Sequence, residues 1–353
     1  MYPPGEKRFL LINHITIIAL FVLILAGGIV RSSGSGMGCP DWPKCFGSIV
    51  PPVNASQLPV DYQDKYLKQR IAKNERFAKT LDVFGYGELA ARIRNDKTLM
   101  EAEEFNAAKT WTEYVNRLIG AITGFLLLAC VLLSINYLKT RKRIFFLSVI
   151  NVVLVGFQAW LGSIVVSTNL LAWVVTVHML LALLIVAISI YTYFHARILR
   201  DQQILTNKPA GILRLIAIFS LALMLIQITI GTEVREQIDA IASFMNNLNR
   251  SEWVSKVGLN FDFHKDLAVG VLISAIVVFY LVRRGYISNR YQLRYASYVL
   301  LLVFLQIIIG VSFSYMALPP VSQAMHLTLA SLMFGAQYYL VLLLKRNNYT
   351  LVK

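Results

Sequence analysis

The sequence predicts an all-α polytopic membrane protein whose eight transmembrane helices form two parallel-repeat four-helix bundles. Three observations carry this prediction. The 353 residues are 57% hydrophobic, with a mean hydropathy of +0.59, and several apolar runs approach the roughly 18–20 residues that span a bilayer. Polar residues recur in these runs at a fixed offset along the chain. Cationic residues gather in alternate loops, as expected where loops lie on two sides of a membrane.

The apolar runs predict spans at approximately residues 10–30, 116–138, 144–166, 172–194, 212–232, 264–282, 295–312 and 322–344. The first run lacks a small-x-small cleavage site and ends in Gly27-Gly28-Ile29-Val30-Arg31, so we interpret it as a span rather than a signal peptide. A lipid-facing open sheet is excluded because its backbone groups would lack hydrogen-bond partners.

The net charge of +15 would suggest nucleic acid as a partner of a soluble protein. In a membrane protein the excess of Lys and Arg instead indicates which loops face the cytoplasm. These residues gather in the loops of one side, whereas loops 163–171 and 314–321 of the other side carry none. We therefore expect a multi-pass protein of a bacterial-type cytoplasmic (inner) membrane, with both termini cytoplasmic and no nucleic acid partner.

An internal repeat relates the two halves of the chain. An offset of 148 residues (326 − 178 = 148) joins His178 to His326. The same offset relates Gln158-x-x-x-Gly162 to Gln306-x-x-x-Gly310, and Asn116-Arg117 to His264-Lys265. A unit of four spans returns to the side on which it started, so its copy is parallel. We expect an N-terminal half over residues 1–200 and a C-terminal half over residues 201–353.

The first outer loop, residues 32–111, is longer than its counterpart. The segment Gly27-x-x-Val30-Arg31 matches Gly231-x-x-Val234-Arg235 at an offset of 204, so the first loop holds 56 more residues (204 − 148 = 56). Residues 62–107 are rich in Lys, Arg, Glu and Ala and predict short helices. Residues 236–263 predict an amphipathic helix on the outer surface. Neither segment is large enough to bury a core of its own.

Histidines inside the spans are the first candidate site, because an ionisable residue in a membrane helix indicates function. Asn116, His178, His264 and His326 all lie near outer ends of spans, so two of them can face each other within a four-helix half. A pair of neutral imidazoles suits a planar iron macrocycle. We interpret His264 and His326 as the two axial ligands of a haem iron. The alternative is a pair of buried polar residues that form packing hydrogen bonds.

The first half differs because it has only His178, with Asn116 at the other position. Glu113 precedes Asn116 by three residues and Arg117 by four, so these side chains share a helical face, and the equivalent second-half residue is Phe261. An open coordination position beside a carboxylate predicts the reactive half, with His178 and Glu113 as catalytic residues. A capping or salt-bridge role for Glu113 is the alternative.

Cations accompany these positions at the outer interface. Arg31, Arg117, Arg235 and Lys265 stand in repeat register, and guanidinium or ammonium groups there could pair with the two propionates of a haem. The alternative is cations that snorkel to the interface.

The outer loop also carries two cysteines. Cys39 and Cys45 flank Pro40-Asp41-Trp42-Pro43-Lys44, and an outer compartment permits disulfides. We predict a Cys39–Cys45 disulfide, as a structural staple or a redox pair. Cys130, inside a span, is expected to pack as a small apolar residue.

The motifs together resemble the haem A synthase family. The segment from Gly27 to Cys45, GGIVRSSGSGMGCPDWPKC, is similar to its first-loop signature, and Glu113-Tyr114-Val115-Asn116-Arg117 resembles its Glu-x-x-His-Arg motif. The resemblance implies oxidation of the C8 methyl group of haem O to a formyl. It also implies a haem b cofactor on His264 and His326, and the substrate haem against His178 and Glu113. Asn116 departs from the family pattern, where this position is a histidine.

The resemblance implies haem O as substrate, with haem O synthase and an electron donor such as quinol as partners in the lipid bilayer. The sequence leaves open whether the protein forms a homo-oligomer. The alternative functions are a membrane cytochrome b that carries electrons without modifying haem, and a parallel-repeat transporter whose histidines relay protons.

Overall fold

The computed structural model describes residues 4–168, 172–201, 204–205, 210–246, 248–285 and 290–345. Within these ranges eight helices are long and apolar enough to cross a membrane, which confirms the predicted number. They are α1 (Pro4–Ser32), α4 (Ala107–Ser134), α5 (Lys142–Ser167), α6 (Ala172–Ile198), α7 (Gly211–Phe244), α8 (Leu259–Gly285), α9 (Arg290–Tyr315) and α10 (Pro320–Leu343). The described residues form no strand. The chain is therefore an all-α, multi-pass membrane protein.

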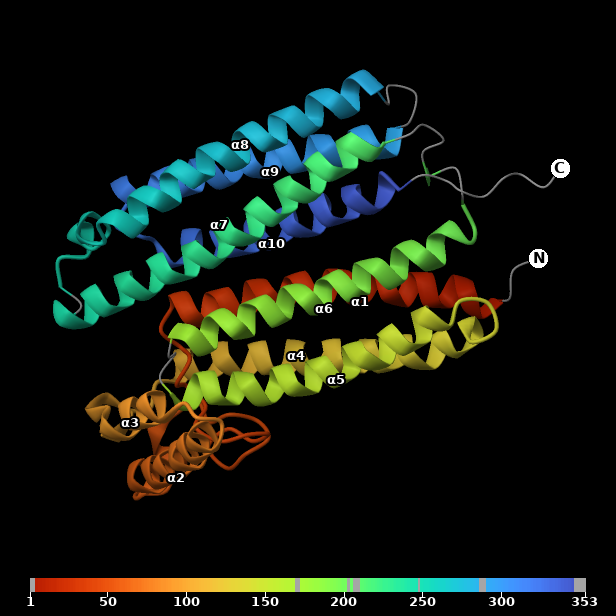
Figure 1. Ribbon diagram of the computed structural model, residues 1–353. Coiled ribbons are helices and arrows are strands. Elements are labelled where there is room, and N and C mark those ends of the chain that lie inside the picture. The colour runs from red at the N-terminus through yellow and green to blue at the C-terminus, as the bar shows by residue number, and fades with distance from the viewer. Residues whose placement is uncertain are drawn as a thin grey trace.

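The spans run side by side in two groups (Figure 1). α1, α4, α5 and α6 form one group, α7 to α10 form the other, and α10 meets both α1 and α6. The parallel repeat itself remains a prediction. Two glycines permit the close approach of the groups: a Cβ on Gly28 would lie 3.3 Å from Cα of Ala324, and one on Gly335 would lie 2.8 Å from Cζ of Phe21. Small residues of this kind bring membrane helices together.

α10 is the central helix of the molecule. In its 18-residue apolar window, 72% of the residues are buried, against 17–39% for the other spans. Its buried side chains include both polar and apolar groups, and Gln337 donates a hydrogen bond to the carbonyl of Ala217 at 3.0 Å. Because α10 contacts both groups, residues near its N-terminal end can serve a cavity shared between them.

The prediction of a separate surface helix over residues 236–263 is wrong. α7 continues without a break to Phe244, 3₁₀ turns cover Arg250–Glu252 and Val254–Lys256, and α8 already begins at Leu259. No Gly or Pro interrupts residues 232–244, and Arg235 pairs with Asp239 at 2.7 Å, one turn along the helix. Ile238 also packs with Trp253 and Leu318, which explains why the helix extends beyond the apolar span.

The insert in the first outer loop is helical, as predicted, although one helix is longer than expected. α2 (Tyr62–Val83) has 22 residues and α3 (Gly87–Asn95) has nine. The turn between them passes through Gly85, whose φ of +84° favours glycine. Phe77 and Ile93 pack against Leu161 and other residues of α5 and α6. The insert therefore shares the core of the membrane helices, in agreement with the expectation that it has none of its own.

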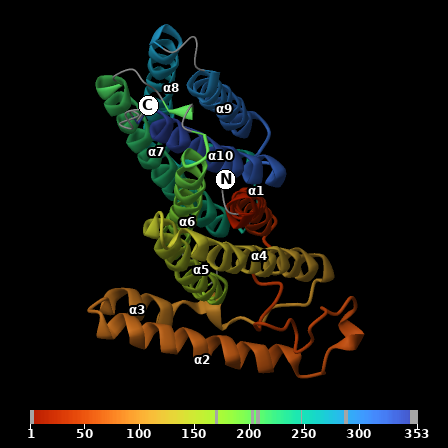
Figure 2. The ribbon, with the colours of Figure 1, turned by 90° about the vertical axis from the view of Figure 1, so that its right-hand side faces the viewer.

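α2 lies across the spans rather than along them. It is seen nearly end-on in Figure 1, where the membrane helices are seen along their length, and along its length in Figure 2. In both views α2 and α3 lie beside α4 and α5, on the side away from α7 to α10. This orientation turns one whole face of α2 toward the ends of the first group.

Candidate functional site

One cavity of about 2050 Å³ joins the two groups of helices. Its lining includes Asn116, His178, His264 and His326, the four positions that the repeat singled out. Small-molecule sites usually measure about 300–1,000 Å³. The volume is therefore enough for two large ligands, one toward each half.

Each histidine in the cavity faces a glycine of the preceding helix. A Cβ on Gly162 of α5 would lie 3.1 Å from Cε1 of His178 on α6. The corresponding distances are 3.0 Å for Gly231 and His264, and 3.4 Å for Gly310 and His326. A larger residue at any of these glycines would displace the imidazole. We call each such pair, a glycine on one helix and the residue that it faces on the next, a corner.

A glutamine one turn before each of these glycines fixes the same three corners. The side-chain amides of Gln158, Gln227 and Gln306 donate to the backbone carbonyls of His178, His264 and His326 at 2.8, 2.9 and 2.9 Å. Sequence reasoning found the motif around Gln158 and Gln306 but missed Gln227, although Gln227-x-x-x-Gly231 has the same spacing. The amide bond sets the register of the two helices and hence the position of the imidazole.

The donor set suits a haem better than a bare metal ion. Within the described residues, no group of three or more His, Cys, Asp or Glu could hold a metal ion. A porphyrin supplies four ring nitrogens and needs only one or two axial ligands from the protein. Nδ1 of each of the three cavity histidines is buried without a hydrogen-bond partner among the described residues. The glycine opposite each ring gives the imidazole room to pack against the neighbouring helix at the cavity wall, so His264 and His326 fit the predicted cofactor as axial imidazoles.

The fourth corner, between α1 and α4, has the glycine but neither the glutamine nor the histidine of the other three. Gly27 faces Asn116, whose Oδ1 would lie 3.9 Å from an added Cβ, and Leu23 stands where the other corners have glutamine. Oδ1 of Asn116 is buried with no hydrogen-bond partner in the part of the chain that the structure describes. This corner is the roomiest of the four and offers an amide where the others offer an imidazole.

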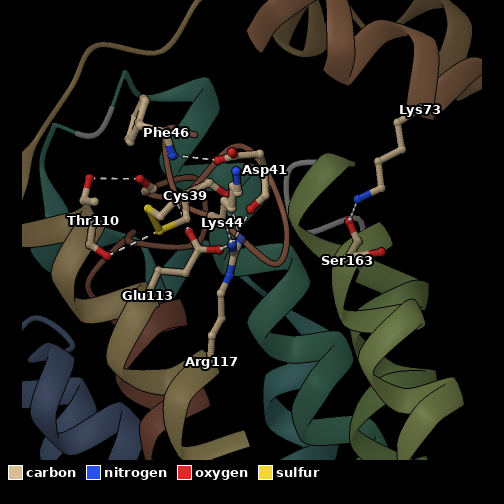
Figure 3. A network of polar contacts seen from close by, with 11 residues as sticks. Cys39, Asp41, Lys44, Phe46, Lys73, Thr110, Glu113, Arg117 and Ser163 are labelled. Carbon is tan, nitrogen blue, oxygen red and sulfur yellow. Dashed lines mark hydrogen bonds and ion pairs between the residues drawn. A yellow bond between two sulfur atoms is a disulfide. The ribbon is translucent and has the colours of Figure 1, made fainter. Parts of the chain in front are cut away.

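Glu113 lies one turn before Asn116 and anchors the first outer loop (Figure 3). Its Oε2 accepts a hydrogen bond from the backbone N–H of Cys39 at 2.7 Å, and its Oε1 pairs with Arg117. Arg117 also donates to the carbonyl oxygens of Cys39 at 2.7 Å and Asp41 at 2.5 Å. Glu113 is only 2% exposed, yet it lines the cavity. It therefore forms the alternative salt bridge and also stands within reach of a bound ligand.

The loop held by this pair contains the predicted disulfide, which the structure confirms between Cys39 and Cys45. Asp41, inside the ring, accepts hydrogen bonds from the backbone N–H groups of Phe46 at 2.6 Å and Gly47 at 2.8 Å. At its other end, Gly38 accepts a hydrogen bond from the Thr110 hydroxyl at 2.9 Å. The loop is thus fixed on the first turns of α4.

Comparison with known proteins gives the family of the chain. Residues 10–85 and 88–338 match the family described as COX15-CtaA, cytochrome oxidase assembly protein. The chain belongs to this family. It is 24% identical over 334 residues to the Heme A synthase of Shewanella oneidensis, covering 87% of each chain. It is 23% identical over 356 residues to the Heme A synthase of Shouchella clausii, covering 97% of this chain and 98% of the relative.

The cavity of this family member brings together most of the predicted site residues. Those that line it are Arg31, Glu113, Asn116, Arg117, His178, Arg235, His264, Lys265 and His326. Cys39 and Cys45 do not line it, although Pro40 to Pro43 between them do. The spacing in sequence indicated a shared end of the membrane helices, and the structure adds that the two groups share one space there.

The four predicted cations already have protein partners. Arg31 of α1 and Arg235 of α7 both pair with Asp239, at 3.3 and 2.7 Å, so equivalent arginines of the two groups meet at one carboxylate. Arg235 also donates to Gln323, and Lys265 pairs with Asp262 at 2.7 Å at the surface. Sequence reasoning missed Asp239, although it follows Arg235 by four residues, a spacing that favours a helical ion pair; it missed Gln323 because that residue lies on a distant helix. The pairing of these cations with propionates remains a prediction.

Proposed function

We propose that this protein is a haem A synthase, a membrane oxidoreductase that converts the C8 methyl group of haem O to a formyl. The observation that carries the proposal is the cavity between the two groups, which three imidazoles and one asparagine line from equivalent corners. The family match supports it, as do relatives named Heme A synthase that align with nearly the whole chain. Two successive hydroxylations of the methyl carbon, each a two-electron oxidation with an external oxidant such as dioxygen, followed by loss of water, would give the aldehyde.

The second half is the proposed haem b site. His264 and His326 come from corners with the full glutamine and glycine arrangement, and a closed six-coordinate iron suits electron transfer. When bound there, haem b would pass electrons to the first half. The protein's part is to hold two imidazoles in fixed orientation and to exclude water.

The first half is the proposed substrate site, with His178 as its one imidazole. Asn116 cannot close the opposite axial position in the same way, so this half keeps room beside the substrate. Glu113 and Arg117 form the outer wall of the site. A buried carboxylate there could hold a proton or stabilise positive charge that develops during oxidation.

The proposal also includes the orientation of the protein in the membrane and its partners. The cation-rich loops predict cytoplasmic termini in a bacterial inner membrane, which puts the disulfide loop on the outer, oxidising side. Haem O would come from the enzyme that makes it, haem O synthase. Reducing equivalents would come from a donor such as quinol.

Expression in a host that makes haem O but no haem A tests the proposal. Chromatography of extracted haems should show haem A when the chain is present, and haem b bound to the purified protein. Haem b without haem A or haem O would favour an electron carrier, and a protein without any haem would favour a transporter. Either result would overturn the proposed activity.

A further inference from the structure

One face of α2 forms a wall of the cavity. Six of the α2 residues that line it recur at helical spacing: Tyr62, Tyr66, Gln69, Lys73, Arg76 and Thr80. Their neighbours Gln63, Leu67, Arg70, Ala72 and Phe77 also line it. α3 contributes no residue to this lining. The long insert is therefore part of the cavity and more than a cover on the outer surface.

Lys73 lies between Arg70 and Arg76 among the cations of this wall, and Figure 3 shows its side chain directed toward Ser163. Its Nζ donates to the carbonyl oxygen of Ser163, near the outer end of α5, at 2.7 Å. The next residue, Asn74, donates to the carbonyl of Ser167 at 2.8 Å. These two bonds fix α2 on the end of α5. They also hold the Lys73 ammonium group at the edge of the cavity that Glu113 and Arg117 line as well.

The positive charge of Lys73 is not balanced by an acid of its own. Among the described residues Lys73 forms no ion pair, whereas its neighbour Arg70 pairs with Glu103 at 3.9 Å. Glu113, the carboxylate whose charge raises the pKa of Lys73, is already paired with Arg117. Burial lowers the pKa of Lys73 below its ordinary value, Arg117 lowers it further, and Glu113 partly opposes this. A half-buried ammonium group in such surroundings gains from an anionic partner.

We propose that the α2 face recognises the carboxylates of the substrate, with Lys73 as the principal partner and Arg76 beside it. This inference rests on the proposed function and adds the group that orients the substrate. The ligand class is a large apolar macrocycle with carboxylates on one edge. Lys73 holds that edge at the outer end of the cavity while the macrocycle extends inward toward His178. Lys73 is thus a positioning residue in substrate binding.

The arrangement also explains why the insert belongs to the first half. The corresponding segment of the second half, residues 236–263, continues α7 and contains no crossing helix in its described residues, 236–246 and 248–263. A cofactor that stays bound can be held by two axial ligands. A substrate that enters and leaves with one axial imidazole needs a second point of attachment, which Lys73 supplies.

The test is a haem titration of the detergent-purified protein with its second-half site already filled. The probe is iron protoporphyrin IX, which has the two propionates, and its dimethyl ester, which lacks their charge. The variants are Lys73→Gln, whose amide can still donate to Ser163, and Lys73→Arg, which keeps the charge. Lys68→Gln is the matched control, because Lys68 lies on the same helix but is exposed and outside the cavity.

We expect Lys73→Gln to weaken binding of the free acid about tenfold, the value of a charge-assisted hydrogen bond. Lys73→Arg and Lys68→Gln should bind like the unmodified protein. The dimethyl ester should bind weakly to every variant, with no further loss in Lys73→Gln. A phosphate headgroup as the natural partner of Lys73 would instead leave the acid and the ester equal in the unmodified protein.

Two results would overturn the carboxylate assignment alone: equal affinities of Lys73→Gln and Lys68→Gln for the free acid, or an equal loss for acid and ester. No saturable titration by the unmodified protein would overturn the proposed function, and the inference with it. Retention of second-half haem b in each variant, measured from its spectrum, separates loss of substrate binding from misfolding.

Discussion

The α7–α8 corner and the α1–α4 corner begin from the same pattern and end in different chemistry. Both have a glycine followed by Val-Arg at the same spacing, and in both the glycine faces a polar residue of the next helix. In the second half that residue is His264, fixed by Gln227. In the first half it is Asn116, with Leu23 in place of the glutamine. The first-half corner therefore lacks both the glutamine and the histidine of its counterpart.

The α1–α4 corner differs from the others in its polar residue. The corners with glutamine and histidine, including the α5–α6 corner of His178, each present a fixed imidazole, whereas the α1–α4 corner presents the amide of Asn116. The corner with leucine and asparagine leaves a wider space beside Gly27, and the crossing helix α2 covers that half from outside. We therefore associate the complete corners of the second half with the cofactor and the incomplete one with turnover.

The largest expected effect comes from removing either imidazole of the second half. His264→Ala or His326→Ala should abolish the low-spin haem b spectrum, because each leaves one axial position unfilled. Reduced-minus-oxidised spectra and haem content of the purified protein measure this. His195→Ala is the control and should keep the spectrum, because His195 lies in the last turn of α6, at the other end of that helix from His178. A bis-histidine spectrum in either ligand variant would contradict the assignment.

Glu113→Gln should reduce haem A by roughly tenfold or more while haem b binds normally. The amide can still accept the hydrogen bond from Cys39, but the charge that pairs with Arg117 is lost. Chromatography of extracted haems should show haem O or a hydroxylated intermediate accumulating. Glu88→Gln on the exposed face of α3 should leave product unchanged. Normal haem A with loss of haem b would mean that the two halves have the opposite roles.

Asn116→His should be tolerated, because Gly27 leaves more room than the glycines of the other corners. Adding Leu23→Gln completes the corner. The double variant should bind a second low-spin haem and lose turnover several-fold, since the open position is then closed. Electron paramagnetic resonance counts the low-spin sites, and Leu23→Gln alone is the control. A double variant with full activity and an unchanged spectrum would refute the proposed role of this corner.

The smallest effect is expected from Gly231→Ala. Its Cβ would lie 3.0 Å from Cε1 of His264, and overpacking of this size costs about 1–3 kcal/mol. We expect partial loss of haem b and a lower midpoint of thermal unfolding. Gly270→Ala on α8 is the control, because its Cβ would meet Leu223 at an ordinary 3.7 Å. Equal behaviour of the two variants would show that the glycine does not set the imidazole position.

The sequence by itself determined the fold class, the eight spans and the equivalent polar positions. Apolar run length fixes the number of spans, since each must cross the same bilayer thickness. The offset that joins His178 to His326 predicted groups at equal depth, and both line the cavity. The resemblance of the Gly27–Cys45 segment also predicted the family correctly.

Only the tertiary structure decided how the pieces outside the spans are used. Hydropathy contains no information about where a polar helix lies, so the sequence predicted α2 as a helix but not as a wall of the cavity. It also misplaced residues 236–263, because packing of Ile238 on Trp253 and Leu318, distant in sequence, extends α7. The meeting of Arg31 and Arg235 at Asp239 depends likewise on how α1 and α7 approach each other. Such long-range contacts follow from the packing of whole helices, which no local pattern encodes.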